Sequence, residues 1–341
     1  MKHRIVSLDC GRKFFTKKWI LSLLNFMGEL GFNQLNMHFS ENQGYRIESR
    51  KYPQIVSELH YSWDDVKEII VHAKSNGIEV VPEFDMPGHL EQVLNQFPHF
   101  RLANTGENDP TGFKNGAVDI TNPDAVALLQ DIMLEHFELF KDSKYFQLGA
   151  DEYVHFEEIK THHPHLLEYA KTHYGEKATG LEPYVAFTNE MSKYVKNHGY
   201  IPRVWNDGFL RKDQKNLVEL DKDIEICFWA KYGSIAPASA FAEKGYKLIN
   251  FNFEYFYYIL TNWVEYNNPK QGAGYTFPSA HKIYSSFVYN KFAGEEILDE
   301  KYKQQILGVA FSIWCDVPER QSEREIFERI QEPMRALAAV L

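Results

Sequence analysis

The chain of 341 residues contains 44% hydrophobic, 15% aromatic and 25% charged residues, a composition that is typical of globular proteins and excludes a disordered or fibrous chain. Its 37 Lys and Arg residues against 47 Asp and Glu residues give a net charge of -10, so we expect no nucleic acid partner and no binding to an anionic membrane. Three widely spaced cysteines are too few for a disulfide framework or a zinc cluster, and we expect free thiols.

Short apolar runs rich in β-branched and aromatic residues alternate with stretches of helical periodicity along the whole chain. In chain order, the predicted strands are residues 5–8, 34–39, 78–84, 145–148, 201–205, 224–229, 247–251 and 309–314. The predicted helices include residues 17–30, 63–75, 123–140, 183–197 and 324–341. No linker or low-complexity tract divides the chain, so we expect one domain over residues 1–341.

The connections differ in length on the two sides of the predicted strands. Four helical stretches end at a glycine that a strand follows at once, and glycine is a common helix stop: Gly31, Gly77, Gly199 and Gly245. Three strand-to-helix segments are long by comparison: residues 85–121, 153–182 and 252–297. This asymmetry predicts an α/β fold of the (β/α)8 TIM barrel type, whose strand-to-helix loops build the active face. An open doubly wound sheet is the alternative, disfavoured because no glycine-rich phosphate turn follows the first strand.

Polar and aromatic side chains follow every predicted strand, and in a barrel these strand ends surround one mouth. The set is Asp9, Arg12, His38, Glu41, Glu83, Asp85, His89, Asp151, Glu152, Trp205, Asn206, Asp207, Trp229, residues 255–258, Trp314 and Asp316. Carboxylates beside tryptophans indicate a carbohydrate site, because sugar rings stack on indoles while their hydroxyls bind charged groups. Asp151 and Glu152 are the expected acid pair for glycoside cleavage, since Gly149 helps the strand break and lets both side chains reach one site.

Each of these residues also has a structural interpretation. An adjacent Asp-Glu pair is commonly a solvated surface feature, Arg12 could pair with a nearby acid, and the tryptophans could cap the barrel core. The cluster of His162, His163 and His165 could bind a metal ion, but we expect a solvated polar loop because no matching acidic pattern accompanies it. The common position of the strand-end residues favours a functional interpretation for the set.

These strand-end segments resemble those of the family 20 glycoside hydrolases, the β-N-acetylhexosaminidases and lacto-N-biosidases, in family order over nearly the whole chain. The matching segments are residues 9–12, 38–46, 81–89, 148–153, 204–207 and 313–316. The resemblance implies a retaining, substrate-assisted mechanism, in which the 2-acetamido oxygen of the sugar attacks its own anomeric carbon and forms an oxazolinium intermediate.

The resemblance also implies roles for single residues. Glu152 would be the general acid and then the base, and Asp151 would hold the acetamido N–H. Tyr258, or Tyr257 as the alternative, would bind the acetamido oxygen. His89, supported by Glu41, would sit behind Glu152 and tune its pKa. The remaining substrate-binding residues would be Arg12, Asp207 and Asp316, with Trp205, Trp229 and Trp314 as pocket walls. Neither a cofactor nor a metal is implied.

Three positions depart from the common family pattern: Glu41 and Asn42 replace two aspartates, Ala150 replaces a glycine, and Asp316 replaces a glutamate. The form of residues 149–153 is closer to the lacto-N-biosidases and bacterial surface hexosaminidases, and a bacterial protein is expected. We expect removal of terminal β-linked N-acetylhexosamine, GlcNAc or GalNAc, from glycans. The alternatives are a lacto-N-biosidase that releases a disaccharide and a carbohydrate-binding barrel without catalysis.

The expected location of the chain is cytoplasmic. No apolar run approaches the roughly 20 residues that span a bilayer, and Asp9 precedes any signal-peptide core. A catalytic domain trimmed from a secreted or cell-surface protein is the alternative.

Overall fold

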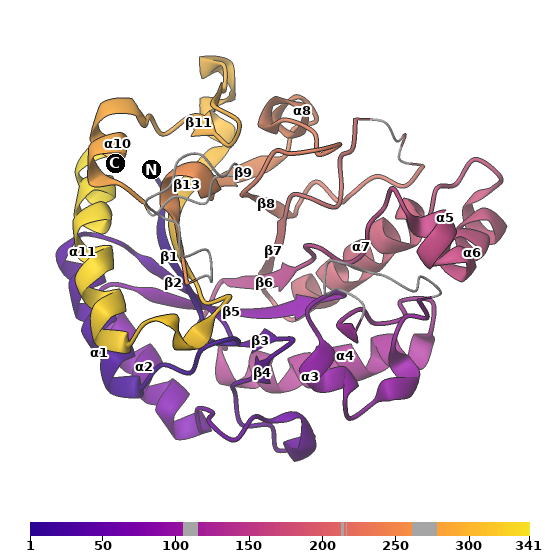
Figure 1. Cartoon of the computed structure of the whole chain (residues 1–341), viewed down its shortest axis with the longest axis horizontal. Helices are drawn as coiled ribbons and strands as arrows, with labels where there is room; N and C mark the ends of the chain where they lie inside the picture. The colour runs from indigo at the N-terminus through magenta and orange to yellow at the C-terminus, as the bar shows by residue number, and fades with distance from the viewer. Residues whose placement is uncertain (105–114, 213–214, 216, 261–277) are drawn as a thin grey trace.

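The computed structural model describes residues 1–104, 115–212, 215, 217–260 and 278–341. Within these residues eight parallel strands close into a barrel (Figure 1): β1 (His3–Asp9), β2 (Gln34–His38), β5 (Glu79–Met86), β6 (Tyr145–Gly149), β7 (Ile201–Trp205), β8 (Glu225–Phe228), β9 (Lys247–Asn250) and β13 (Ile306–Trp314). The barrel closes because β1 pairs with both β2 and β13. The predicted TIM barrel is therefore confirmed.

A further parallel strand, β10 (Tyr257–Ile259), was not predicted and completes one side of the mouth. The first half of β13, as far as Val309, pairs with β9, whereas residues Ser312 to Trp314 pair with β10. β10 thus replaces β9 as the neighbour of β13 at the carboxyl end of the barrel. The tyrosine-rich segment, expected to be part of a loop, is fixed beside the mouth by backbone hydrogen bonds.

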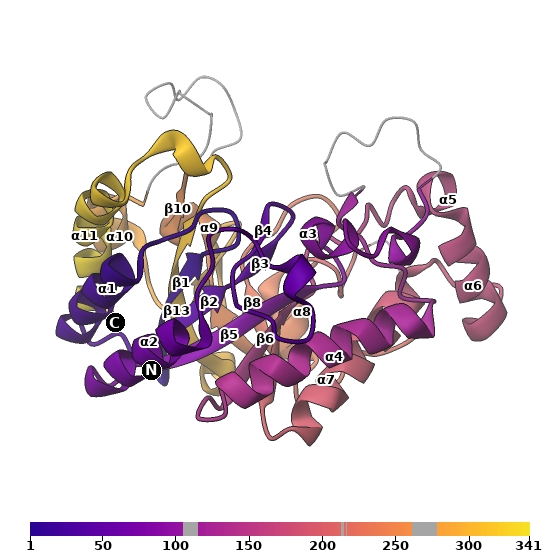
Figure 2. The same cartoon turned by 90° about the horizontal axis from the view of Figure 1, so that it is seen from below.

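Helices surround the barrel on its outside (Figures 1 and 2). The longest are α1 (Lys17–Glu29), α2 (Trp63–Ser75), α4 (Pro123–Leu139), α7 (Leu181–Asn197) and α11 (Glu323–Val340), close to the predicted ranges. Ser62 and Ser322 begin α2 and α11 with reciprocal capping boxes that satisfy free backbone N–H groups. The four glycines predicted as helix stops have φ values of 75°, 71°, 91° and 88°, as that role requires.

The strand-to-helix segments contain more regular structure than expected. They carry the hairpin of β3 (Ser40–Glu41) with β4 (Gly44–Tyr45), the helices α3 (Glu91–Leu94), α5 (Ile159–His162), α6 (Pro164–Tyr174), α9 (Phe253–Phe256) and α10 (Ala280–Ser286), and the hairpin of β11 (Lys291–Phe292) with β12 (Glu296–Ile297). The short helix that ends before Gly245 is α8 (Ala238–Glu243). Short 3-10 turns lie at Pro53–Ile55, Pro98–Phe100, Glu300–Gln305 and Pro318–Arg320. The predicted long segments 85–121 and 252–297 include residues 105–114 and 261–277, which lie outside the described residues.

The histidine cluster is not in the solvated loop that we expected. His162 ends α5 and His165 lies in the first turn of α6, which Pro164 opens with its fixed φ. His163 is buried between the two helices, and its Nδ1 lies 3.0 Å from the carbonyl oxygen of Ala103. Packing between two short helices therefore accounts for this histidine.

The amino-terminal end of the barrel interior is filled by an ion pair. Arg203 and Glu225 are both 2% exposed and lie 2.9 Å apart, and Arg203 also donates to Gln34 over 3.0 Å. Paired polar side chains therefore pack this end of the barrel interior. The three cysteines are buried and free, as predicted. Among the described residues, no helix is both long and apolar enough to cross a membrane.

Candidate active site

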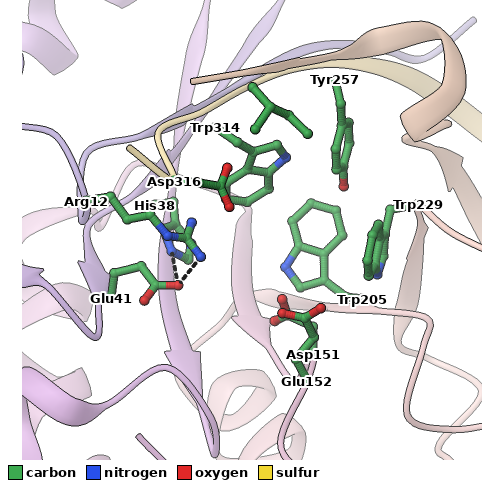
Figure 3. Close-up of a pocket in the computed structure, with 11 residues that line it drawn as sticks. Arg12, His38, Glu41, Asp151, Glu152, Trp205, Trp229, Tyr257, Trp314 and Asp316 are labelled. Carbon is green, nitrogen blue, oxygen red and sulfur yellow. Dashed lines mark ion pairs between the residues drawn. The ribbon is translucent and has the colours of Figure 1, made fainter. Parts of the chain in front are cut away.

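A pocket opens at the carboxyl ends of the barrel strands (Figure 3). Its lining is Arg12, His38, Glu41, Asp151, Glu152, Trp205, Trp229, Tyr257, Ile259, Trp314 and Asp316. Ten of these follow the predicted strands in the sequence analysis, and all of the ten except His38 were given a role there. Three predicted residues, His89, Asp207 and Tyr258, are not in the lining. Ile259 was missed because no strand was expected there, although the run Tyr-Tyr-Ile has the β-branched and aromatic character of one.

The acid pair lies where β6 ends in a sharp turn. Gly149, Ala150 and Glu152 have φ values of 70°, 69° and 48°, which are left-handed conformations that residues with a Cβ adopt at a cost. A Cβ on Gly149 would lie 1.8 Å from Oδ1 of Asp85, so only glycine fits there. Asp85 in turn accepts the N–H of Ala150 over 3.1 Å. This turn brings two adjacent carboxylates into one pocket, as the sequence analysis required.

Arg12 is held at the pocket by two carboxylates. Its Nη1 lies 2.9 Å from Asp9 Oδ2. Its Nη2 lies 2.6 Å from Glu41 Oε1 (Figure 3). Asp9 also accepts the backbone N–H of Arg12 and that of Cys315, both over 2.9 Å. The side chain of Arg12 is only 15% exposed, and its Cζ lies 5.8 Å from the ring centroid of Trp314. Arg12 is thus a fixed cation facing the pocket, which pairs with acids and lines the site at the same time.

His89 connects Glu41 to the acid pair from behind the pocket. Its Nδ1 lies 2.5 Å from Glu41 Oε1, and its Nε2 lies 3.5 Å from Asp151 Oδ2 and 3.6 Å from Glu152 Oε2. Burial alone would lower the pKa of His89, but the charges of Glu41, Asp151 and Asp85 raise it well above its ordinary value. The imidazole is therefore cationic and lies within reach of both carboxylates. The glutamate that replaces the common aspartate at position 41 still contacts His89.

Glu152 has the electrostatic setting of a general acid. Burial, together with the charges of Asp151 and Asp207, raises the pKa of Glu152 to about 8, although the charges of His89 and Arg12 oppose the shift. Glu152 is therefore protonated at neutral pH. Its side chain retains 29% exposure and that of Asp151 retains 17%, so both can meet a ligand.

Asp207 supports the pocket and does not line it, which corrects the expectation of direct substrate contact. Its Oδ2 accepts the backbone N–H of Glu152 over 3.0 Å, and its Oδ1 accepts the indole N–H of Trp229 over 2.9 Å. Both oxygens therefore face protein donors. Asp207 fixes the backbone of Glu152 and the indole of Trp229 relative to each other.

The order of preference between the two tyrosines is also corrected. Successive residues of a strand point to opposite faces, so β10 directs Tyr257 into the pocket and Tyr258 away from it. Tyr258 is buried, and its hydroxyl donates to the side-chain oxygen of Gln321. Tyr257 lies parallel to Trp229, with ring centroids 6.0 Å apart and an interplanar angle of 4°. Tyr257, which was the alternative, is thus the tyrosine that a ligand would meet.

The comparisons with known proteins agree with this geometry. The model of the catalytic domain of glycosyl hydrolase family 20 matches residues 1–336. The chain belongs to glycosyl hydrolase family 20. Among curated family 20 proteins, a lacto-N-biosidase of Bifidobacterium bifidum is 29% identical over 333 residues, covering 94% of this chain and 26% of that protein. The β-hexosaminidase subunit B1 of Dictyostelium discoideum is 27% identical over 319 residues, covering 86% of this chain and 54% of that protein.

Solved structures of family 20 proteins share the fold. A catalytic module of a pneumococcal exo-β-D-N-acetylglucosaminidase superposes with a TM-score of 0.79 at 23% identity, over 99% of this chain and 83% of that chain. The chain therefore shares the barrel fold of that module. The present chain spans about a quarter to a half of the length of the two curated relatives.

In the described part of this family 20 barrel, two groups of side chains could hold a metal ion by spacing alone. They are His38, Glu83 and Asp85, and Asp85, His89 and Asp151, whose donor atoms lie within 4.8 Å of one another. Asp85 already accepts the N–H of Ala150, and Glu83 accepts the indole N–H of Trp205. A metal ion would have to compete with these bonds, and the expectation of a metal-free mechanism stays a prediction.

Proposed function

We propose that the chain is a retaining, exo-acting β-N-acetylhexosaminidase that removes a terminal β-linked GlcNAc or GalNAc from glycans. The observation that carries this proposal is the raised pKa of Glu152 beside Asp151 at the entrance of an aromatic pocket. A protonated carboxyl group at neutral pH can donate to the leaving glycosidic oxygen. The adjacent carboxylate can stabilise positive charge that develops on the sugar. A binding module would have no use for this proton donor.

The proposed mechanism is substrate-assisted, as in other family 20 enzymes. Asp151 accepts a hydrogen bond from the acetamido N–H, and the hydroxyl of Tyr257 donates one to the acetamido oxygen. Together they orient that oxygen toward the anomeric carbon. Glu152 transfers its proton to the glycosidic oxygen as the bond breaks and the oxazolinium ring closes. Glu152, now ionised, then removes a proton from the water that opens the ring. The retained β configuration follows from two inversions at the anomeric carbon.

The recognition of the terminal sugar is assigned to the opposite side of the pocket. Arg12 and Asp316 face the space between the tryptophans and can bind ring hydroxyls as charged donor and acceptor. Trp205, Trp229 and Trp314 can cover the apolar faces of the sugar and of its acetamido methyl group. The charge of Arg12 is already paired with the carboxylates of Asp9 and Glu41. This suits a sugar whose hydroxyls carry no charge.

A lacto-N-biosidase activity is the second candidate, favoured by the 29% identity to the Bifidobacterium bifidum enzyme over 94% of this chain. The choice between a one-sugar and a two-sugar pocket depends on loops such as residues 252–289, which lie partly outside the described residues. A bacterial and cytoplasmic origin likewise stays a prediction.

The deciding experiment compares aryl β-N-acetylglucosaminide with aryl β-lacto-N-bioside as substrates of the purified chain, with and without EDTA. Release of aryl alcohol from the monosaccharide alone supports the main proposal. Release from the disaccharide alone supports a lacto-N-biosidase. Release from neither, with glycan binding retained, would contradict both enzymatic proposals, and inactivation by EDTA would contradict the metal-free mechanism.

The pH dependence of the reaction should reveal the protonated acid. Because the pKa of Glu152 is about 8, kcat/KM should be sustained at neutral pH and should fall as the pH rises through about 8. The charge of His89 lowers this pKa, so the variant His89→Gln should move the falling limb to higher pH as well as reducing turnover. A limb that stays in place in His89→Gln would contradict this coupling.

The two tyrosines of β10 provide a matched pair of variants. Tyr257→Phe removes the hydroxyl that is proposed to orient the acetamido oxygen, and kcat should fall by about 10²-fold. Tyr258→Phe removes a hydroxyl that faces Gln321 outside the pocket, and should change thermal stability but not kcat. Steady-state kinetics on the aryl substrate measure both. Equal losses of kcat in the two variants would contradict the assignment of Tyr257.

A further inference from the structure

A carboxylate that the mechanism does not use lies in the centre of the barrel beneath the pocket. Glu83 lies within β5, opposite His38 at the end of β2, and its residue exposure is 0%. A buried carboxylate is costly unless donors surround it, so its neighbours indicate what it is kept for. Glu83 does not line the pocket.

Three side chains from two other strands contact this carboxylate. Oε1 accepts the indole N–H of Trp205 over 2.9 Å and lies 3.2 Å from Nδ1 of His38. Oε2 accepts the side-chain N–H of Asn36 over 2.6 Å. The two carboxylate oxygens of Glu83 therefore connect β5 to side chains of both β2 and β7.

Two of these partners are themselves parts of the pocket surface. Trp205 and His38 both line the pocket. His38 lies edge-on to Trp314, with centroids 5.3 Å apart, and Trp205 lies 5.9 Å from the same ring. Because Trp314 packs against both rings, the contacts of Glu83 with Trp205 and His38 also restrict the position of Trp314. A sugar ring that stacks on these groups needs their planes to be set in advance.

We propose that Glu83 is a positioning residue of the sugar pocket, whose carboxylate holds the indole of Trp205 and the imidazole of His38 in the orientations that receive the sugar. This inference rests on the proposed function in one respect, that the ligand is an N-acetylhexosamine. Among the described residues, no hydrogen bond joins Glu83 to Asp151 or Glu152. Its loss should therefore weaken sugar binding more than it slows the chemical steps.

The variant Glu83→Gln tests this with almost no change in volume. Glutamine offers one acceptor oxygen in place of two, so either Trp205 or Asn36 loses its acceptor, and the negative charge that faces His38 is removed. The matched control is Glu225→Gln, at a second buried carboxylate of the barrel, which is 2% exposed and pairs with Arg203 at the opposite end from the mouth. Both variants should lower the melting temperature, because each breaks a buried charged contact.

The readouts are KM and kcat on the aryl β-N-acetylglucosaminide, and the Kd of N-acetylglucosamine by calorimetry. For Glu83→Gln we expect KM and Kd to rise by about tenfold, with a smaller change in kcat. For Glu225→Gln we expect both to stay at the wild-type values. Unchanged KM and Kd in folded Glu83→Gln, or equal rises in both variants, would overturn the inference.

A second variant covers the case in which Glu83→Gln does not fold. Trp205→Phe keeps an aromatic face but removes the N–H that Glu83 accepts, and Kd should rise, whereas an unchanged Kd would overturn the inference. Failure of the inference about Glu83 is distinguishable from failure of the proposed function. A wild-type chain that neither cleaves the aryl substrate nor binds N-acetylglucosamine refutes the function, while a wild type that does both, with variants that bind equally well, refutes only the role of Glu83.

Discussion

Replacing Glu152 with glutamine is expected to lower kcat by about 10²–10⁴-fold on substrates with a poor leaving group. The amide keeps the shape of the side chain but cannot give a proton to the glycosidic oxygen. An aryl group that leaves as a stable anion needs less protonation, so the loss should shrink as the leaving-group pKa falls. Steady-state kinetics across a series of aryl β-N-acetylglucosaminides measure this dependence.

The same variant should respond to an added nucleophile. Azide attacks without having to lose a proton, so it should restore part of the turnover of activated substrates that water cannot open without a base. The control is Glu158→Gln, the same change at a side chain 53% exposed outside the pocket, which should keep wild-type kinetics. Wild-type turnover in folded Glu152→Gln would refute its role as the acid.

Replacing Asp151 with asparagine is expected to lower kcat by about 10²–10³-fold through a different step. The neutral amide cannot stabilise the positive charge of the closing oxazolinium ring, and its N–H₂ group can oppose the acetamido N–H. Ring closure does not depend on protonation by this residue. The loss should therefore persist on activated aryl substrates, in contrast to Glu152→Gln.

The outcome for Asp151→Asn is judged against Asp223→Asn, the same substitution at a side chain 77% exposed on the surface. That control should show wild-type kinetics and stability. If Asp151→Asn recovered activity on activated substrates to the same extent as Glu152→Gln, the two carboxylates would not have separate roles. The substrate-assisted assignment would then be wrong.

The fold was predictable because its signals are local. Gly31 and Gly77 end helices, and the apolar run that follows each of them has the length of a strand. The alternation of strands and helices could therefore be predicted from the sequence. The approximate location of the site followed from the same reasoning, since parallel strands deliver their carboxyl ends to one mouth. Asp151 and Glu152 could be singled out because Gly149 precedes them.

The parts that were missed depend on contacts between distant segments. Whether Tyr257 or Tyr258 enters the pocket depends on the pairing of β10 with β13, some 55 residues further along the chain. Likewise, Asp207 follows a strand as the other site residues do, but the N–H groups of Trp229 and Glu152 take up both of its oxygens. No periodicity in the sequence contains this information, because each partner belongs to a different strand.

The shared pairing of β13 divides one strand between two tasks. Residues near its start, as far as Val309, complete the wall of the barrel with β9, while Ser312 to Trp314 carry the segment that presents Tyr257. The tyrosine that lines the pocket is thus supplied by an additional strand that the barrel does not require for its own closure. Residues 257–259 could therefore be exchanged, in evolution or by design, to alter which sugars bind, while the pairing of β1 with β13 still closes the barrel.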